Sequence, residues 1–246
     1  MDAVYSFFTP DQLKLLQQSN PFIRLNDAVY SIIEQGIISG QLPPGTRLSV
    51  TKIAENLDVS RTPVSDALEL LKAEGFVCNN DENTNRYYVF DISYNTLDQL
   101  FTARKAIENT AAYLCAQRYR SMDIKRLKKL ADDFRGCFDR RDYTGFGALD
   151  TEFHRLIIRS CKNPYLIKMY SSMERFIDYY SIRSREYMLS LENDPSFDVL
   201  ASQHSSICNA IMLGLPEVAE KSSNAHLETC YCLSMRYHTF TGKLGK

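Results

Sequence analysis

Apolar residues recur at helical spacing on both sides of a tight turn between residues 49 and 77. The first run, residues 51–57, predicts a short amphipathic helix. A turn at Asp58 follows, and aspartate is one of the few non-glycine residues that accept the left-handed backbone of a sharp corner. The second run begins after Ser60, a residue type that caps helix N-termini, and ends at Gly75. The two runs predict a helix-turn-helix, whose second helix is the one that enters a DNA major groove.

The region behind the second helix predicts a hairpin. Residues 76–78 and 86–90 are β-prone and flank a turn-rich connection. A hairpin in this place is typical of the wing of a winged helix-turn-helix. A plain corner inside an all-α protein is the alternative interpretation of the helix pair, and the hairpin disfavours it. In front of the pair, residues 25–39 predict a further helix and residues 1–20 a leader without an assigned role.

Beyond residues 91–95 the pattern is helical almost throughout. Helices are predicted over residues 97–119, 123–140, 143–160, 165–189, 197–213 and 216–237. The short connections between them indicate an antiparallel bundle of six or seven helices. The predicted fold class is therefore mainly α, with a leader over residues 1–20, a winged helix-turn-helix domain over residues 21–91 and an all-α domain over residues 92–246.

The composition is that of an ordinary globular protein. The chain has 246 residues, enough for two domains, and 44% of them are hydrophobic. No apolar run has the length of a bilayer-crossing helix, and the N-terminus lacks a signal pattern. The seven cysteines are scattered without a CxxC pair, which indicates buried, reduced thiols in a cytoplasmic protein.

The charge balance bears on nucleic-acid binding. The net charge of −1 gives no general attraction to DNA. Residues 21–91 contain six basic and ten acidic residues, a net charge of −4. If this region binds DNA, we expect few phosphate contacts, made by a few placed basic side chains, helix N-termini and backbone amides.

Three of the four histidines are placed to meet. A single histidine on an apolar helix face is usually a satisfied core residue. Asp150 and His154, however, lie one helical turn apart and point the same way. His204 and His226 lie ten residues before and ten residues after a tight turn at residues 214–216. An antiparallel hairpin therefore returns the two imidazoles to the same level.

Three imidazoles and one carboxylate at one point suit a divalent metal such as zinc, nickel, manganese or iron. Burying so many polar groups without a common partner is costly. We therefore predict a metal ion bound by Asp150, His154, His204 and His226, with Asp150 either ligating the ion directly or holding one of the histidines in place. Arg104, on the first helix of the bundle, is expected to clamp the carboxylate of an anionic ligand, and the alternative is a surface arginine whose stem is buried.

Short motifs at both ends of the chain carry a family resemblance. They are LPPGTRL at residues 42–48, VSRTPV at 59–64, LKAEG at 71–75, DTEFH at 150–154, QH at 203–204 and AHL at 225–227. From about residue 24 to residue 243 the chain resembles the GntR superfamily of bacterial transcription regulators, in its FadR-like branch with an FCD effector domain. The four predicted metal ligands match the metal site of that family position by position.

The resemblance implies a homodimer whose winged domains read a two-fold operator in double-stranded DNA, and whose FCD bundle binds a small carboxylate metabolite held partly by the metal. The family's DNA-contacting positions correspond to Arg61 and Thr62, with Arg86 in the wing. The full set of residues expected to contact DNA is Arg47, Lys52, Arg61, Thr62, Ser65 and Arg86. Ser65 stands where the family usually has an arginine, and Tyr87 where it has a wing-tip glycine.

The predicted function is a metabolite-responsive DNA-binding transcription regulator and not an enzyme. The first alternative is a metal-dependent enzyme that acts on a small carboxylate, in which the ion activates water. The sequence offers no obvious general base beyond the ligands, and this alternative leaves the wing unexplained. The second alternative is a regulator that binds its ligand but has weakened DNA binding, which the charge of residues 21–91 favours.

Overall fold

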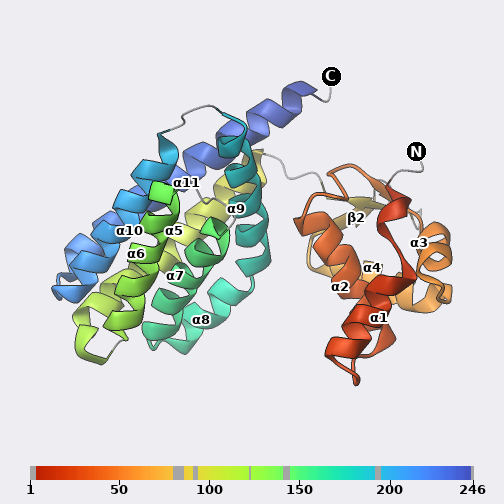
Figure 1. Cartoon of the computed structure of the whole chain (residues 1–246), viewed down its shortest axis with the longest axis horizontal. Helices are drawn as coiled ribbons and strands as arrows, with labels where there is room; N and C mark the ends of the chain where they lie inside the picture. Colours follow the sequence, from red (N-terminus) through yellow and green to blue (C-terminus); the bar gives the residue numbers. More distant parts are fainter. Residues whose placement is uncertain are drawn as a thin grey trace. The chain divides into compact units, whose positions relative to one another are not determined.

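The chain divides into two compact units, Met1–Ile92 and Ser93–Lys246, in a computed structural model of the protein. The structure describes residues 4–79, 86–90, 94–121, 123–140, 145–191 and 195–244. The first unit is called the N-terminal unit and the second the bundle (Figure 1). Among the described residues, no helix combines the length and the apolar character that a bilayer crossing requires.

The N-terminal unit is a set of short helices packed with a small sheet. Its elements are η1 (Tyr5–Phe7), α1 (Pro10–Ser19), α2 (Leu25–Ile38), β1 (Arg47–Leu48), α3 (Val50–Leu57), α4 (Arg61–Ala73), β2 (Val77–Asn79) and β3 (Tyr87–Val89). The strands are antiparallel in the order β1-β3-β2, with Leu48 opposite Tyr87 and Val77 opposite Val89. This arrangement confirms the predicted winged helix-turn-helix, although the connection at residues 80–85 lies outside the described residues.

The corner between α3 and α4 follows from local sequence signals. Ser49 caps α3 by accepting a hydrogen bond from the Lys52 amide, and Asp58 turns the chain with a left-handed φ of 55°. Gly75 ends α4 with a φ of 85°. The expectation that the Ser60 side chain caps α4 is wrong. Its backbone is extended as at an N-cap, but its hydroxyl makes no capping hydrogen bond.

The inner face of α4 is the predicted one. Val64, Ala67, Leu68 and Leu71 are all buried, because the 3.6-residue repeat places them on the side that packs against α2 and α3. The opposite side of α4 remains at the surface. The second helix of the pair is thus held by its apolar face and presents polar residues outward.

The leader is part of the N-terminal unit. Phe8 and Leu13 are buried, and α1 packs against α2 and α3. A Cβ on Gly36 would lie 2.6 Å from Phe7 Cε1, so glycine permits this close approach. Tyr5 Oη donates a hydrogen bond to the Arg47 carbonyl at 2.9 Å and accepts one from the Ser49 amide at 3.1 Å. The leader therefore holds residues 47–49, which precede the helix-turn-helix, by hydrogen bonds. This role was not predicted from the sequence.

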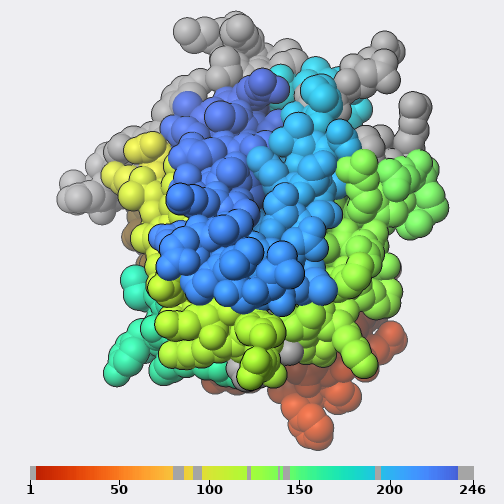
Figure 2. Space-filling view, turned by 90° about the vertical axis from the view of Figure 1, so that its left-hand side faces the viewer, coloured from red at the N-terminus to blue at the C-terminus, as the bar shows by residue number. Residues whose placement is uncertain are grey.

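The bundle consists of long antiparallel helices. They are α5 (Tyr94–Gln117), α6 (Ile124–Arg140), α7 (Phe146–Ser160), α8 (Pro164–Ser171), α9 (Glu174–Leu189), α10 (Ser196–Met212) and α11 (Pro216–Leu244), with the short η2 (Tyr119–Ser121) after α5. Figure 2 shows α10 and α11 side by side on one face, with α5 and α6 at its two edges. This bundle confirms the predicted fold class.

One predicted helix of the bundle is divided. Residues 165–189 were expected as a single helix, but the chain breaks at Ser172 and Met173 between α8 and α9. The hydroxyls of Ser171 and Ser172 donate hydrogen bonds to the carbonyls of Lys168 and Met169. Side chains that bond to the preceding turn compete with the helical hydrogen bonds. Two serines in succession therefore end α8 without a glycine or proline.

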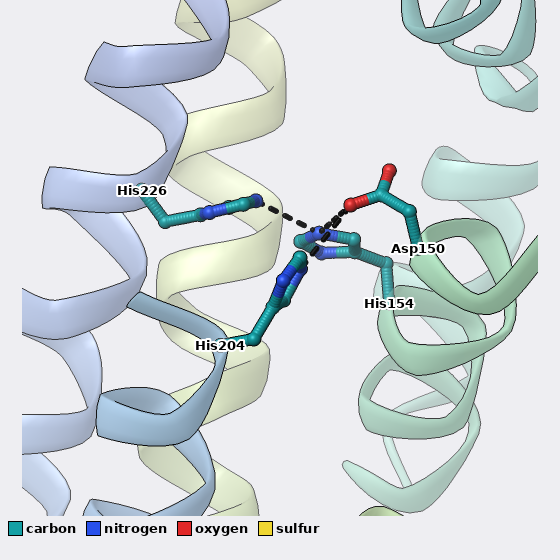
Figure 3. Close-up of side chains that lie close together, drawn as sticks. All are labelled: Asp150, His154, His204 and His226. Carbon is teal, nitrogen blue, oxygen red and sulfur yellow. Dashed lines mark hydrogen bonds and ion pairs between the residues drawn. The ribbon is translucent and has the colours of Figure 1, made fainter. Parts of the chain in front are cut away.

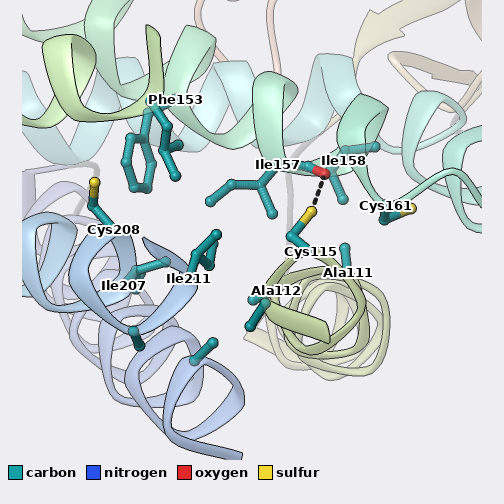
Figure 4. Close-up of a cluster of buried hydrophobic side chains, with 14 of the residues drawn as sticks. Ala111, Ala112, Cys115, Phe153, Ile157, Ile158, Cys161, Ile207, Cys208 and Ile211 are labelled. Carbon is teal, nitrogen blue, oxygen red and sulfur yellow. Dashed lines mark hydrogen bonds between the residues drawn. The ribbon is translucent and has the colours of Figure 1, made fainter. Parts of the chain in front are cut away.

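The apolar core of the bundle joins α5, α7 and α10 (Figure 4). Ala111 and Ala112 let α7 and α10 approach α5 closely, and Phe153 and Ile211 fill the space between them. Cys115 Sγ lies 3.2 Å from the Ile157 carbonyl. All seven cysteines are free thiols, and four of them are buried while Cys232 is exposed. The expectation of buried thiols thus holds for only part of the set.

Candidate metal and ligand site

The helix α7 brings Asp150 and His154 to one face of the bundle interior. The two residues are one turn apart, and Phe153 and Ile157 beside them are buried in the apolar core. The apolar neighbours fix which side of α7 faces inward. His154 is therefore buried with them, and Asp150 is half-buried at the edge of the same face.

The hairpin of α10 and α11 supplies two further imidazoles. Its turn contains Gly214 at a φ of 65°, where an L side chain is strained. His204 and His226 lie at equal distances from this turn, and both side chains are completely buried. Their rings are 4.5 Å apart between centroids. The equal spacing of His204 and His226 from the turn thus brings the two histidines face to face.

The four side chains converge on one point (Figure 3). One ligand atom from each of Asp150, His154, His204 and His226 lies within 4.8 Å of every other. His154 Nε2 is 3.0 Å from His226 Nε2 and 3.8 Å from Asp150 Oδ1. His204 Nε2 is 3.2 Å from Asp150 Oδ1. Three helices therefore contribute a nitrogen or oxygen lone pair to the same small volume.

These separations fit a bound divalent ion. Two ligand atoms that each lie about 2.1 Å from one ion are about 3.0 Å apart at a right angle and about 3.4 Å apart at the tetrahedral angle. The observed separations of 3.0, 3.2 and 3.8 Å lie at or near this range. Imidazole nitrogens with one carboxylate are a donor set suited to zinc, nickel, manganese or iron.

The electrostatics favour neutral imidazoles at His204 and His226 beside a charged carboxylate. At His154 burial lowers the pKa, but Glu108 outweighs burial and raises it. Burial lowers the pKa of His204 below its usual value. Burial, together with the neighbouring imidazoles, lowers the pKa of His226 well below its usual value. Burial alone raises the pKa of Asp150, but the hydrogen bond with His204 and the other imidazoles outweigh it, so the pKa falls below the ordinary range. His204 and His226 therefore offer nitrogen lone pairs beside the negative charge of Asp150.

An ion pair on α5 orients His154. Glu108 Oε2 lies 2.8 Å from His154 Nδ1, and Glu108 Oε1 lies 2.7 Å from Arg104 Nε. All three side chains are buried. Burial raises the pKa of Glu108, but Arg104 and His154 outweigh it and hold this pKa at about 2. A carboxylate that accepts the second N–H of an imidazole directs its other nitrogen to a ligand, and Glu108 is placed to do so here.

The other two histidines lack this support. His204 Nδ1 and His226 Nδ1 are buried and have no hydrogen-bonding partner among the described residues. The alternative interpretation of Arg104 as a surface arginine is wrong, because only 3% of the residue is exposed. Its first partner is Glu108, and it also lines the pocket next to the four ligand atoms.

A pocket opens directly beside the four side chains. Its cavity volume is about 40 Å³, and Asp150 and Arg104 contribute to its wall. Cys230 also lines it and places Sγ 3.4 Å from His226 Nε2. Ser184 and Ser234 meet there at 2.9 Å between their hydroxyl oxygens. These residues were not predicted from the sequence, although Cys230 follows His226 by one helical turn and is detectable from that spacing.

Known families match both units. Residues 25–83 match the bacterial regulatory proteins of the gntR family, and residues 99–229 match the FCD domain. The chain belongs to the GntR family and carries an FCD domain. It is thus a GntR-type transcription regulator, as the sequence resemblance indicated.

Individual relatives agree with this assignment. The chain is 29% identical to the Nta operon transcriptional regulator of Aminobacter aminovorans over 185 residues, which cover 72% of this chain and 83% of the relative. It is 24% identical to the HTH-type transcriptional repressor RspR of Escherichia coli over 211 residues, 86% and 89% of the two chains. The solved structure of Escherichia coli McbR/YncC shares the fold, with a TM-score of 0.66, 17% identity, and 87% and 99% coverage.

The N-terminal unit carries the predicted DNA-contacting residues at its surface. Arg47, Lys52, Arg61, Thr62 and Arg86 are exposed. Arg61 and Thr62 form the first turn of α4, Lys52 lies in α3, Arg47 opens β1, and Arg86 directly precedes β3. The five residues thus come from different parts of the unit, and none is buried in its core.

Ser65 differs from these residues. It is only partly exposed, and it lies close enough to Tyr87 in the wing to lower the pKa of that hydroxyl, against the larger effect of burial, which raises it. Tyr87 is buried and donates a hydrogen bond to Glu69 Oε1 at 2.6 Å. The two departures from the GntR pattern, Ser65 and Tyr87, are therefore in contact with each other. An arginine at position 65 would have to give up this contact.

Proposed function

We propose that this GntR-type regulator binds a divalent metal in its bundle, together with a small carboxylate, and that these ligands alter its affinity for operator DNA in the cytoplasm. The observation that carries the proposal is the meeting of four donor atoms from α7, α10 and α11 within 4.8 Å. Buried polar groups without a partner are costly, and one cation would serve all four.

The side chains of the bundle have distinct parts in this proposal. Asp150, His154, His204 and His226 hold the ion, and Glu108 orients His154 through Nδ1. The ion, when bound, supplies positive charge and open coordination positions for a carboxylate oxygen or water. Arg104 lines the same pocket, and its guanidinium is suited to a carboxylate that approaches from the pocket side.

DNA recognition is proposed for the N-terminal unit. Arg61 and Thr62 at the start of α4 are placed to reach bases, while Arg47, Lys52 and Arg86 are placed to reach phosphates. In a homodimer the two α4 helices meet successive turns of a two-fold operator about 34–36 Å apart. Ligand binding changes operator affinity if the ligand prefers one spacing of the two winged units over another.

A regulator with weakened DNA binding is the second candidate. The observation that favours it is that Ser65, which stands where the family usually has an arginine, is only partly exposed and lies beside Tyr87 of the wing. A missing base-reading arginine costs about 1–3 kcal/mol of discrimination at its position. The charge of −4 over residues 21–91 works in the same direction. The two candidates differ in the operator affinity of the protein without ligand.

The test combines composition with binding. Elemental analysis and native mass spectrometry of the purified protein report the metal, any retained ligand and the number of subunits. Gel-shift titration on DNA selected from a random library then measures operator affinity with and without metal and a panel of short carboxylates. We expect a change of about 5- to 150-fold. Tight affinity that is equal under all conditions contradicts the proposal, and weak affinity under all conditions supports the second candidate.

A further inference from the structure

A second arginine faces the pocket beside the candidate metal site. Arg185 on α9 lines the same pocket as Arg104 and Asp150. Its guanidinium lies against the backbone of Gly147 in the first turn of α7, because a Cβ at that position would be 1.6 Å from Arg185 Nη1. Glycine at position 147 is thus what allows the guanidinium to occupy this place.

Among the described residues, Arg185 differs from the arginines around it in having no anionic partner. Arg104 pairs with Glu108, Arg155 pairs with Glu174, and Arg183 pairs with Glu186. Within the described part of the chain, the Arg185 guanidinium makes no hydrogen bond or ion pair. A half-buried cation without a partner, aimed into a pocket, is suited to an anion that arrives with a ligand.

The charge balance of the pocket points to two negative charges. Glu108 neutralises Arg104. A divalent ion held by Asp150 retains one positive charge, because the three imidazoles are neutral as ligands. Arg185 adds a second positive charge. A ligand with one carboxylate therefore neutralises only one of these two positive charges, whereas a ligand with two carboxylates neutralises both.

The geometry places the two charges apart. Gly147 and Asp150 are three residues apart on α7, which is a rise of about 4.5 Å. The Arg185 guanidinium lies against Gly147, and Asp150 is the first of the proposed metal ligands along α7. The rest of the pocket wall is largely apolar and includes Phe146, Met188 and Leu200. A short carbon chain with an anionic group at each end fits a pocket that offers two cationic groups and an apolar wall.

We propose that the ligand of the pocket is a short aliphatic dicarboxylate, with one carboxylate at the metal and Arg104 and the other at Arg185. This inference rests on the proposed function and names the class of its ligand. Arg185 acts as a specificity-determining residue, and Gly147 keeps its guanidinium in place. A compact dianion such as phosphate has no carbon chain to place against the apolar wall.

The test is calorimetry on the metal-loaded full-length protein with matched four-carbon acids. Succinate and butyrate differ only in the second carboxylate, and inorganic phosphate serves as a compact dianion. We expect succinate to bind at least tenfold more tightly than butyrate. Arg185→Met should reduce this ratio to about twofold or less while leaving butyrate affinity and metal content unchanged. Gly147→Ala should have the same effect, because its methyl group displaces the guanidinium.

Arg159→Met is the control for net charge, because Arg159 is exposed on the last turn of α7, far from the pocket. It should keep the wild-type ratio of succinate to butyrate affinity. Equal binding of the two acids by the wild type, tighter binding of phosphate, or binding of none of them overturns the dicarboxylate assignment. If metal is present in these cases, the metal site of the proposed function still stands. Absence of metal from the protein overturns both proposals.

Discussion

Charged side chains are used in different ways in the two units. In the N-terminal unit Arg61 and Lys52 are exposed, and the apolar core beneath them is complete without them. In the bundle His204 and His226 are completely buried, and Glu108 and Arg104 lie buried beside them. Exposed charges add little to folding stability, whereas buried ones must find partners. The proposed DNA-contacting surface should therefore tolerate substitution with little loss of folding stability, and the buried site in the bundle should tolerate it less.

The largest effect is expected from His204→Ala. Because the imidazole is fully buried and points at the other three ligands, its loss should lower metal affinity more than about 1,000-fold. The melting temperature of the bundle should then no longer respond to added metal. Ile207→Ala, one turn along α10 in the apolar core, is the matched control. It should destabilise the bundle but retain the metal, as measured by calorimetry and elemental analysis. Full metal content in His204→Ala contradicts the assignment.

The leader offers a test in the other unit. Phe8→Ala should lower the free energy of unfolding of the N-terminal unit by about 3–5 kcal/mol, because Phe8 is fully buried against that unit. Leu15, on the same leader helix, is 65% exposed, and Leu15→Ala should change this free energy by less than about 0.5 kcal/mol. Denaturant titration followed by circular dichroism measures both. Metal affinity should be unchanged in either variant, since the leader contributes nothing to the bundle site.

Glu108→Gln should have a smaller effect on the metal. The amide still reaches His154 Nδ1 but carries no charge, so metal affinity should fall about 10- to 100-fold without being lost. Competition with a calibrated chelator measures this change. Glu152→Gln, a substitution of the same kind outside the pocket on α7, should leave metal affinity unchanged. An unchanged affinity in Glu108→Gln would show that Glu108 serves only to neutralise Arg104.

The smallest effects are expected at the DNA surface. Arg61→Ala should weaken operator binding about tenfold and leave the melting temperature unchanged, because Arg61 is exposed at the start of α4. Ser65→Ala should weaken it less than about threefold, since Ser65 is only partly exposed and lies beside Tyr87. Gel shifts at fixed salt compare the two. A larger loss in Ser65→Ala would mean that this hydroxyl reads a base.

The fold was predictable where the signals are local. The corner at Asp58 and the inner face of α4 depend on backbone preference and on a 3.6-residue repeat, both visible in one short stretch. The break between α8 and α9 was not predictable in this way, because serine is common inside helices. The hydroxyls of Ser171 and Ser172 end the helix only through the hydrogen bonds that they select.

The site was predictable where spacing determines position. His204 and His226 are symmetric about a turn, and Asp150 and His154 share a face, so their meeting follows from helix geometry. The partners from other helices were not accessible in the same way. Glu108 reaches His154 and Arg185 reaches Gly147 through tertiary packing that no local pattern encodes.

The central claim is that one cation joins α7, α10 and α11. A crystal structure of the purified protein, with anomalous scattering recorded on both sides of the absorption edge of the metal found by elemental analysis, tests it most directly. We predict one ion per chain, about 2.0–2.2 Å from the Nε2 atoms of His154, His204 and His226 and from an Asp150 oxygen. A structure without an ion, in which His154 and His226 remain hydrogen-bonded directly to each other, would contradict the account.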